Sequence, residues 1–332
     1  MIKTIAYFPR DAEYLGNKVF DIQHRTNVTY NLDRWVALRD FLEKKGIALN
    51  TYDQYKNWKE VDVFLCTDPG RQAFTFILRN FLVLPRRRIL GLTEPPLINS
   101  LGWRYLGFYS WLFKIILSWN PELTRQGGKY LPWHYPINFV ADKYQEYKTN
   151  QKKNLCLMIH SNKTTKQRGE LYSLRRQLIT YFTNRGDRLL DLYGYGWNDE
   201  NHEQPFFSSL YQGTTADKKE TYSQYYFVFC IDNSIVPGYI TYDPFIAMST
   251  GAVPIYLPMP DTDTHIPAET YINFSDFEAD WAGLVLRLEE IVKSGEYERY
   301  QERAEAYLHS KQFQTFTIPQ FCEDVYQAIL RA

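Results

Sequence analysis

The sequence lacks a long apolar segment. None of its 332 residues lies in a run of the ~18 uninterrupted apolar residues that crossing a bilayer requires. Residues 108–119 come nearest, but Lys114 interrupts them. We expect this stretch to pass from a buried helix into a strand, with contact to a membrane surface as the alternative. The first residues, MIKTIAYFPRD, also lack the apolar region of a signal peptide. These absences predict a cytoplasmic location, with peripheral contact at the inner face of the membrane left open.

Cysteine is scarce and histidine is scattered. The four cysteines lie far apart and mostly beside apolar runs, which predicts reduced, buried thiols and neither a disulfide framework nor a zinc site. The histidines show no ligand-like spacing, so the sequence predicts no metal site from them. The residues concerned are Cys66, Cys156, Cys230, Cys322, His134, His160 and His265.

Net charge is absent as well. Lys and Arg number 38, and Asp and Glu also number 38, so the composition predicts no nucleic-acid partner. No Walker motif and no GxGxxG fingerprint follows an expected strand, and Gly194-Tyr195-Gly196 is too short to count. The sequence therefore lacks the motifs that usually indicate a kinase-like or a dinucleotide-binding protein.

What the sequence does contain is a repeated alternation of short apolar strands with amphipathic helices. This alternation predicts an α/β fold with parallel sheets and helices on both faces. Strands are expected at 2–7, 47–51, 61–65, 88–92, 115–118, 155–159, 189–193, 226–231 and 252–257. A helix capped by Asn31 follows the first strand, and a capping box at 275–278 should open another.

The length predicts two domains. A charged segment without large aliphatic residues, 141–154, is typical of a linker. We therefore expect an N-terminal domain over 1–145 and a C-terminal domain over 150–315. The last helix, 317–332, is expected to be able to pack back on the first domain. The sequence does not fix the oligomeric state.

The stretch 226–256 carries most of the chemical information. A buried strand ends in Asp232-Asn233-Ser234, a Val-Pro-Gly turn follows, and a short helix starts around Asp243-Pro244 before a second strand. Polar groups are thereby gathered at the carboxyl end of a strand, which is where open α/β sheets bind ligands.

Glu94 has a similar position. It follows the expected strand 88–92 directly and precedes Pro95 and Pro96, which limit backbone freedom. The residue is a candidate general base, with an ordinary solvated glutamate as the alternative.

The stretch 225–256 resembles the signature of the family 10 glycosyltransferases, the α-1,3-fucosyltransferases. In that signature an aromatic strand leads to Phe-Glu-Asn-Ser, then Tyr-Ile-Thr-Glu-Lys, then Gly-Ala-Val-Pro-Ile/Val-Tyr. The matching segments here are Cys230-Ile231-Asp232-Asn233-Ser234, Tyr239-Ile240-Thr241-Tyr242-Asp243 and Gly251-Ala252-Val253-Pro254-Ile255-Tyr256. Ser161-Asn162 with Arg175 looks like the family's Ser-Asn loop and donor-binding arginine, and Glu94 falls where the family carries its catalytic glutamate.

The resemblance implies two Rossmann-like domains of the GT-B type facing a cleft. It implies an inverting transfer of fucose from GDP-fucose to a hydroxyl of a glycan such as lipopolysaccharide or O-antigen. Glu94 would be the base, and no metal or other cofactor would be obligatory. The donor would be held by Ser161, Asn162, Arg175, Lys219, Asp232, Asn233, Ser234, Tyr239, Thr241, Tyr242 and Asp243.

Tyr242-Asp243 departs from the family pattern, because it replaces the Glu-Lys pair that holds ribose and diphosphate. Asp243 either caps the following helix or faces the phosphates, where it would repel them. Tyr242 either bonds a ribose hydroxyl or packs inward. A different nucleotide-sugar donor, an inactive copy, and a noncatalytic carbohydrate-binding protein are therefore the alternatives. Asp261-Thr-Asp263, an Asp-X-Asp pair, lies too late in the chain to favour a metal site.

Overall fold

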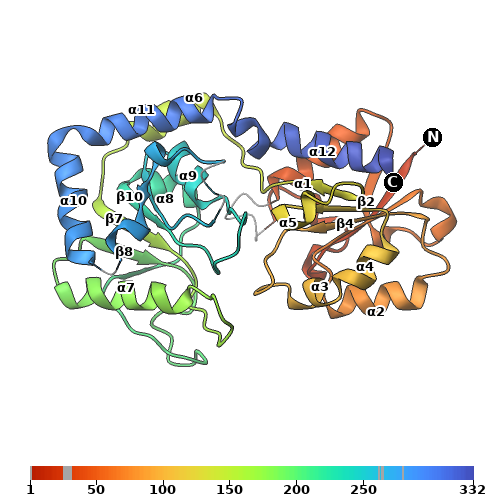
Figure 1. Cartoon of the computed structure of the whole chain (residues 1–332), viewed down its shortest axis with the longest axis horizontal. Coiled ribbons are helices and arrows are strands. Elements are labelled where there is room, and N and C mark those ends of the chain that lie inside the picture. The colour runs from red at the N-terminus through yellow and green to blue at the C-terminus, as the bar shows by residue number, and fades with distance from the viewer. Residues whose placement is uncertain (1, 25–31, 261, 263–264, 279) are drawn as a thin grey trace. The chain divides into compact units, whose positions relative to one another are not determined.

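The computed structural model describes residues 2–24, 32–260, 262, 265–278 and 280–332. The chain forms two compact units (Figure 1). Unit 1 comprises Met1–Asn138 with Thr315–Ala332, and unit 2 comprises Phe139–Gln314. Each unit contains a six-stranded sheet in which all described pairings are parallel, so the predicted α/β class is confirmed.

The sheet of unit 1 has the strand order β2-β1-β3-β4-β5-β6. Its strands are β1 (Thr4–Phe8), β2 (Ala48–Thr51), β3 (Val63–Thr67), β4 (Arg87–Leu92), β5 (Ile115–Ser118) and β6 (Tyr130–Pro132). Its α-helices are α1 (Asp33–Glu43), α2 (Arg71–Asn80), α3 (Ser100–Arg104), α4 (Leu106–Leu112), α5 (Pro121–Thr124) and α12 (Ile318–Arg331). The predicted cap Asn31 lies outside the described residues.

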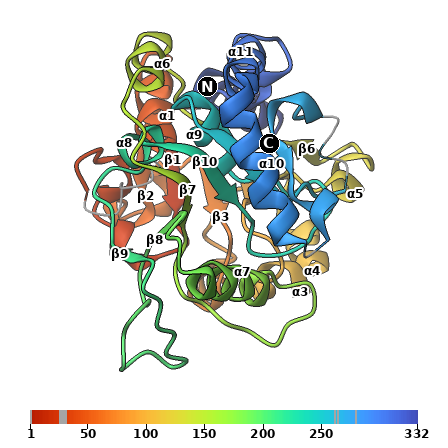
Figure 2. The ribbon, with the colours of Figure 1, turned by 90° about the vertical axis from the view of Figure 1, so that its left-hand side faces the viewer.

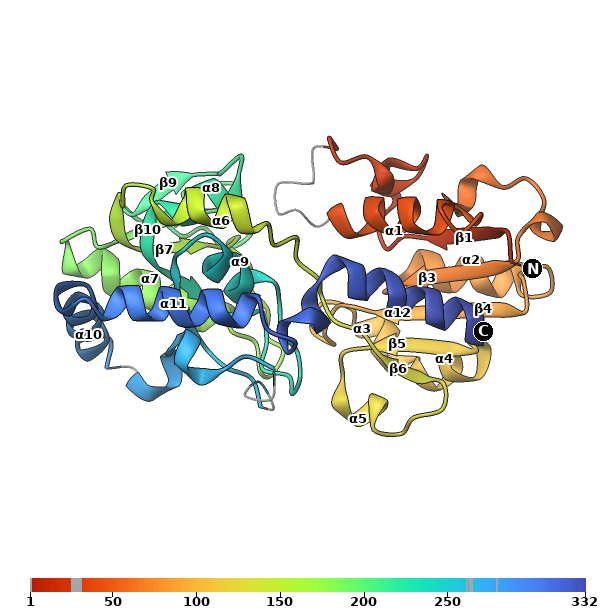
Figure 3. The ribbon, with the colours of Figure 1, turned by 90° about the horizontal axis from the view of Figure 1, so that it is seen from above.

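Helices cover both faces of this sheet, because its central strands are apolar on both sides. Helices α1 and α12 pack on one face, where Trp35 meets Phe321 edge to face. Figure 3 views unit 1 from this side. Helices α2 and α4 cover the opposite face through Ile77, Tyr109 and Leu112. The last helix thus belongs to the core of unit 1.

The sheet of unit 2 has the strand order β12-β11-β10-β7-β8-β9. Its strands are β7 (Asn154–Ile159), β8 (Leu190–Tyr193), β9 (Tyr211–Gly213), β10 (Tyr225–Cys230), β11 (Val253–Tyr256) and β12 (Ile272–Asn273). Its α-helices are α6 (Ala141–Lys148), α7 (Tyr172–Arg185), α8 (Lys218–Ser223), α9 (Asp243–Ser249), α10 (Trp281–Ser294) and α11 (Glu296–Leu308).

The core of unit 2 is built around β7 and β10. Helix α7 covers one side of the sheet through Leu178 and Phe182, and α9 lies on the other side (Figure 2). All seven residues of α9 are buried. Tyr297 and Gln301 of α11 both donate hydrogen bonds to the carbonyl of Gly251, just after α9. The segment that carries the family signature is therefore enclosed by packing.

The predicted linker 141–154 is helical in its first half, which corrects that expectation. Helix α6 has no aliphatic stripe, but Tyr144 is fully buried and donates a hydrogen bond to the Gln301 carbonyl. Lys148 forms an ion pair with Glu305 at 3.2 Å. These contacts attach α6 to α11, so the change of unit falls at 138/139 and not at 145–150.

The expected capping box at 275–278 is also wrong. Residues Phe274–Phe277 form a 3₁₀ turn, and α10 begins at Trp281 with the Asp280 carboxylate accepting from the Gly283 amide. The four cysteines are buried free thiols, as predicted. Within the described residues, no helix is long and apolar enough to span a membrane.

Candidate functional site

Each sheet has one point at which the strand order reverses direction. In unit 1 the reversal lies between β1 and β3, and in unit 2 it lies between β7 and β10. Ligands of open α/β sheets bind outside the carboxyl ends of the strands at such points. Glu94 follows β4, the neighbour of β3, and Asp232 follows β10. The fold therefore brings the candidate residues to the edges where chemistry is expected.

The backbone that carries Glu94 is held by three tryptophans. The indole N–H of Trp133 donates to the Leu92 carbonyl at 3.2 Å, that of Trp119 to the Thr93 carbonyl at 2.9 Å, and that of Trp103 to the Glu94 carbonyl at 2.9 Å. Three consecutive carbonyls are thus fixed by rigid side chains. This arrangement removes the backbone freedom of the segment that presents Glu94.

Asp68 holds the other side of the same segment. Its carboxylate accepts from the amides of Thr93 and Glu94 at 2.9 and 3.0 Å, from the Thr93 hydroxyl and from Asn99. Asp68 has a left-handed backbone, with φ of 44°, at the end of β3. Gly91 leaves the space that Trp133 fills, since a Cβ there would lie 2.5 Å from the indole ring. The support of Glu94 is therefore built from both neighbouring strands.

The Glu94 carboxylate is half-buried, and its two oxygens have different surroundings. Its Oε1 accepts from the Tyr135 hydroxyl at 3.2 Å and lies 3.7 Å from Arg10, whereas no described residue donates to Oε2. Burial raises the pKa of Glu94, and the Asp68 charge raises that pKa further, while Arg10 and Tyr135 lower it. A raised pKa moves a carboxylate towards the value that suits a general base near neutral pH.

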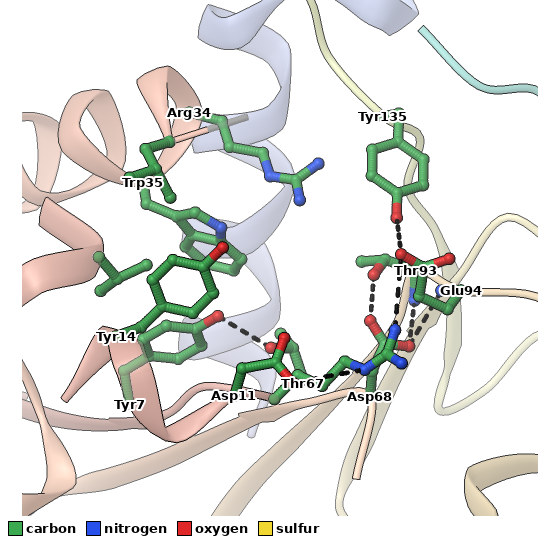
Figure 4. Close-up of a pocket in the computed structure, with 13 residues that line it drawn as sticks. Tyr7, Asp11, Tyr14, Arg34, Trp35, Thr67, Asp68, Thr93, Glu94 and Tyr135 are labelled. Atoms are coloured by element: carbon green, nitrogen blue, oxygen red, sulfur yellow. Dashed lines mark hydrogen bonds and ion pairs between the residues drawn. The ribbon is translucent and has the colours of Figure 1, made fainter. Parts of the chain in front are cut away.

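These groups line a pocket of about 90 Å³ within unit 1 (Figure 4). Arg34, at the start of α1, is 7% exposed, and its guanidinium lies 4.7 Å from the Tyr135 ring centroid and 5.5 Å from that of Trp35. Its buried Nε has no hydrogen-bond partner among the described residues. The pocket therefore offers an unmet donor, aromatic surface and a carboxylate to a ligand. It is lined by Tyr7, Arg10, Asp11, Tyr14, Val19, Leu32, Arg34, Trp35, Thr67, Asp68, Thr93, Glu94 and Tyr135.

In unit 2 the reversal point gathers a second set of polar residues around Asp232. The Asp232 carboxylate accepts from the Thr241 hydroxyl at 2.6 Å through Oδ1, while its buried Oδ2 has no partner among the described residues. Burial raises the pKa of Asp232 to about 7. Arg175, which is 4% exposed on α7, donates to the Ile231 carbonyl and to Asn233 Oδ1 at 3.2 Å. The fold thus brings Thr241, Arg175 and Asn233 together with Asp232, and their role in donor binding stays a prediction.

Three further buried polar atoms at this edge have no hydrogen-bond partner among the described residues. They are His160 Nε2, Asn162 Oδ1 and Ser234 Oγ. Burial, together with the charges of Arg175 and Lys218, lowers the pKa of His160 well below its usual value, so the ring is neutral. Buried polar groups are nearly always bonded in folded proteins, so a cluster of unmet ones is typical of a ligand site.

Asn162 also has a structural role. Its amide nitrogen donates to the carbonyls of Gly196 and Gln204, at 2.9 and 3.1 Å, and so ties two parts of the loop after β8. Ser161 is half-buried beside it. Gly194, with φ of 135°, has the His160 carbonyl 2.0 Å from where a Cβ would stand, so only glycine fits there. The Gly194-Tyr195-Gly196 segment therefore packs its backbone closely against the end of β7.

The expectation that Asp243 caps α9 is wrong. The N-cap position is Tyr242, and no side chain makes a capping bond there. The Asp243 carboxylate instead accepts from the ammonium of Lys218 on α8, in an ion pair whose side chains are 12% and 5% exposed. Burial lowers the pKa of Lys218, but Asp243 and Tyr242 raise it, and the net shift is upward. Asp243 thus neutralises a buried cation.

The remaining predicted donor residues surround this ion pair or lie close to it. The Tyr242 ring centroid lies 5.1 Å from the Lys218 ammonium, and Tyr239 is buried. Lys219 is half-buried one position after Lys218, so it points to another side of α8. The roles expected for Tyr239, Tyr242 and Lys219 stay predictions.

Sequence reasoning misses several groups that complete the two sites. Asp68 has a usable signal, because it ends a buried strand as Glu94 does, yet its Cys-Thr-Asp-Pro-Gly context indicates only a turn. Arg10, Arg34 and Tyr135 come from distant parts of the chain and carry no local pattern. Lys218 lies 25 positions before its partner Asp243, and only the fold brings the two together.

No group of three or more His, Cys, Asp or Glu residues in the described part of the chain is placed to hold a metal ion. The Asp261-Thr-Asp263 pair lies outside the described residues.

Solved structures share the fold over nearly the whole chain. An alpha1,3-fucosyltransferase has a TM-score of 0.52 and 13% identity, and the match covers 98% of this chain and 90% of that one. The protein HepE from Anabaena, in complex with UDP-glucose, has a TM-score of 0.58 and 9% identity, with 99% and 100% covered. An alpha-glucosyltransferase in complex with UDP and DNA has a TM-score of 0.54 and 13% identity, with 98% and 99% covered. The fold is thus that of GT-B glycosyltransferases.

No curated protein matches this sequence. The family model described as "Glycosyltransferase family 10 (fucosyltransferase) C-term" matches residues 148–329, which include all the predicted residues of unit 2. Because that match spans more than half of the 332 residues, the chain is a transferase that belongs to glycosyltransferase family 10.

Proposed function

We propose that the protein transfers a sugar, fucose from GDP-fucose, to a hydroxyl of a glycan acceptor with inversion at the anomeric carbon. The observation that carries this proposal is the state of Glu94. Its backbone is held by Trp103, Trp119, Trp133 and Asp68, its pKa is raised, and Oε2 is free to accept a proton. A carboxylate so fixed beside a pocket suits a general base.

In the proposed step, Glu94 Oε2 takes the proton of the acceptor hydroxyl as its oxygen attacks the anomeric carbon. The bond from that carbon to the diphosphate oxygen breaks, and the electron pair leaves with the nucleoside diphosphate. Tyr135, by donating to Oε1, keeps the carboxylate oriented. The pocket around Arg34 would then bind the acceptor, whose hydroxyls can accept from the unmet guanidinium donor.

The donor is proposed to bind at the edge of unit 2. His160 and Ser234 supply unmet polar atoms there, and Arg175 supplies a buried cation beside Asp232. Positive groups stabilise the negative charge that develops on a departing diphosphate. Arg175 already donates to the Ile231 carbonyl, so binding of a diphosphate would share or redirect those bonds.

A second candidate is the same reaction with another nucleotide-sugar donor. The Lys218–Asp243 ion pair favours it, because the motif position that carries lysine in the family is here a carboxylate whose charge is balanced from α8. Membership of the family favours either transferase over a noncatalytic carbohydrate-binding protein. A cytoplasmic site of action on a lipopolysaccharide or O-antigen acceptor remains part of the proposal.

Calorimetry with GDP, UDP and their sugars tests both candidates. We expect a guanosine nucleotide to bind for the first candidate, and a preference for a uridine nucleotide would identify the second. If no nucleotide binds, the proposed transferase reactions are both refuted.

Glu94→Gln tests the mechanism separately. Removal of the base should lower transfer by about 100-fold or more, because general base catalysis contributes about that factor, and nucleotide binding should be retained. Glu122→Gln, an exposed change in the same unit, is the matched control and should leave transfer unchanged. Transfer that survives Glu94→Gln would remove Glu94 from the mechanism.

A further inference from the structure

One part of unit 1 has a strong local excess of positive charge. The whole chain has no net charge, yet residues 69–121 contain seven Lys and Arg residues and a single carboxylate, Glu94. Glu94 lies in the pocket described above and does not offset the charge on the outer surface. The basic residues are Arg71, Arg79, Arg86, Arg87, Arg88, Arg104 and Lys114. All of them except Arg88 are exposed.

The same stretch exposes large apolar side chains. Leu82, in the turn between α2 and β4, is 92% exposed, and Trp111 of α4 is 71% exposed. Leu78 and Val83 are 52% and 55% exposed. A turn that projects a leucine almost fully into solvent gains nothing from that residue in the isolated protein, because its apolar surface stays in water.

These residues form one surface on the outer helices of unit 1. The Phe81 ring stacks on Trp111 at 5.7 Å between centroids, and the Arg88 guanidinium lies 5.3 Å from the Phe81 ring. Arg88 also donates to the Leu112 carbonyl, which joins β4 to α4. Figure 1 shows α2, α3 and α4 along the lower edge of unit 1. We call Leu78, Leu82, Val83 and Trp111, with Arg79, Arg86 and Lys114, the basic-apolar surface. Arg87 does not belong to it, because it pairs with Val63 and shares the sheet face of Ile89, which α1 and α12 cover.

The composition of this surface selects its partner. A second copy of the chain that used the same surface would set arginines against arginines, and the 69–121 stretch offers no exposed carboxylate to pair with them. Apolar side chains that project among arginines and a lysine fit the interface of a bilayer, where the acyl region accepts the former and anionic headgroups attract the latter.

We infer that the basic-apolar surface binds the protein to an anionic lipid bilayer, with Leu82 and Trp111 inserted at the headgroup level. This inference extends the proposed function by giving its membrane contact a defined surface. It would hold unit 1, which carries Glu94, beside acceptors attached to lipid. Residues 108–119 are mostly buried, so the contact of that stretch with the membrane is limited to Trp111 and its neighbours.

Flotation of the full chain with lipid vesicles tests the inference. Wild-type protein should float with vesicles of phosphatidylglycerol mixed with phosphatidylcholine, float less as salt is raised, and stay unbound with phosphatidylcholine alone. Leu82→Ser should lower the partition coefficient by about tenfold through lost apolar burial. The double variant Arg79→Gln/Arg86→Gln should lower it by about tenfold or more through lost attraction to anionic headgroups.

The matched control is the double variant Leu286→Ser/Lys293→Gln on α10 of unit 2. Leu286 is 68% exposed and the Lys293 side chain 75%, so the control removes the same kinds of group elsewhere. It should bind the vesicles as wild type does. Equal binding to neutral vesicles, no binding by wild type, or unchanged binding in the unit 1 variants would overturn the inference.

Analytical ultracentrifugation tests whether a second copy of the chain, and not a bilayer, covers the basic-apolar surface. If wild type self-associates and Leu82→Ser abolishes that association, the surface joins copies of the chain and the lipid inference is overturned. Nucleotide binding measured on the same variants keeps the two proposals apart. If the protein binds nucleotide but no vesicle, only the membrane inference is refuted. If it binds vesicles but no nucleotide, only the proposed transferase reaction is refuted.

Discussion

The ion pair between Lys218 and Asp243 gives the sharpest stability prediction. Both side chains are almost completely buried, so each charge is separated from water and depends on the other. Removing one member of a buried pair typically costs about 3–5 kcal/mol, because it leaves an uncompensated charge. We expect Asp243→Asn and Lys218→Met each to lower the free energy of unfolding by about 3 kcal/mol or more.

The double variant Lys218→Met/Asp243→Asn should behave differently. It leaves no buried charge, so its loss should be about 2 kcal/mol, mainly from an amide with an imperfect partner. The two single effects would then fail to add by about 4 kcal/mol. Urea unfolding followed by circular dichroism measures all three variants. The control is Lys293 with Glu289 on α10, a pair at 3.1 Å whose side chains are 75% and 35% exposed, and its coupling should stay below about 0.5 kcal/mol.

The pH dependence adds an independent check. In Asp243→Asn the carboxylate that raises the pKa of Lys218 is gone and only weaker causes, Tyr242 among them, still oppose burial, which is the largest cause, so that pKa should fall below its unfolded value. The native state of the variant then binds fewer protons than the unfolded state in that pH range. Its stability should therefore rise, relative to wild type, as pH increases towards about 10.

Two results would refute this reasoning. Additive single effects, or an Asp243→Asn cost below about 1 kcal/mol, would mean that the pair is solvated and that Asp243 is available to face a ligand. Conversely, Asp243→Lys, which returns the family's lysine to its place, should destabilise the protein, because it sets two ammonium groups together in a buried position.

Two further predictions concern protonation. Arg10→Gln removes a cation that lowers the pKa of Glu94, so the acid limb of the pH profile of kcat/KM should move to higher pH, and Arg39→Gln, on α1, should not move it. For Asp232 the pKa is raised to about 7, so the native state holds a proton that the unfolded state releases between about pH 4 and about pH 7. Stability should therefore fall as pH rises through that range, and Asp232→Asn should flatten this part of a thermal-midpoint profile, while an unchanged slope would contradict the assigned pKa.

The fold could be predicted from the sequence because its determinants are local. Strands β3 and β10 are continuous runs of apolar residues, a pattern typical of parallel strands buried on both faces. Position at a strand end also suffices to predict Glu94 and Asp232 as candidate site residues. To predict where the strand order reverses in each sheet, one must also know which strands pair, and sequence periodicity does not contain that information.

Helix α6 shows where local reasoning fails. Half of its residues are charged and none is a large aliphatic, so an isolated segment of this kind would be expected to stay extended or disordered. Its order comes from one buried aromatic ring, Tyr144, and from contacts to α11 more than 150 positions away in the chain, as in the Tyr144–Gln301 bond. Tertiary packing of this kind leaves no periodic signal, so the sequence pattern misplaces the linker.

The signature around Asp243 shows a different limit of sequence analysis. A motif lists neighbours in the sequence, whereas the charges at a site come from neighbours in space. The family places a lysine at this position, and this chain places a carboxylate there, which by itself predicts repulsion of a diphosphate. The fold supplies the missing ammonium group from α8, so that Lys218 and Asp243 together present no net charge where the family presents a cation. In the proposed donor site, electrostatic attraction for the diphosphate would then rest more heavily on Arg175, and the unmet atoms of His160, Asp232 and Ser234 would contribute more to the choice of nucleotide. A substitution that would indicate loss of function in the motif alone is, in three dimensions, a redistribution of charge between α8 and α9. Calorimetry with guanosine and uridine nucleotides then decides between the two proposed donors.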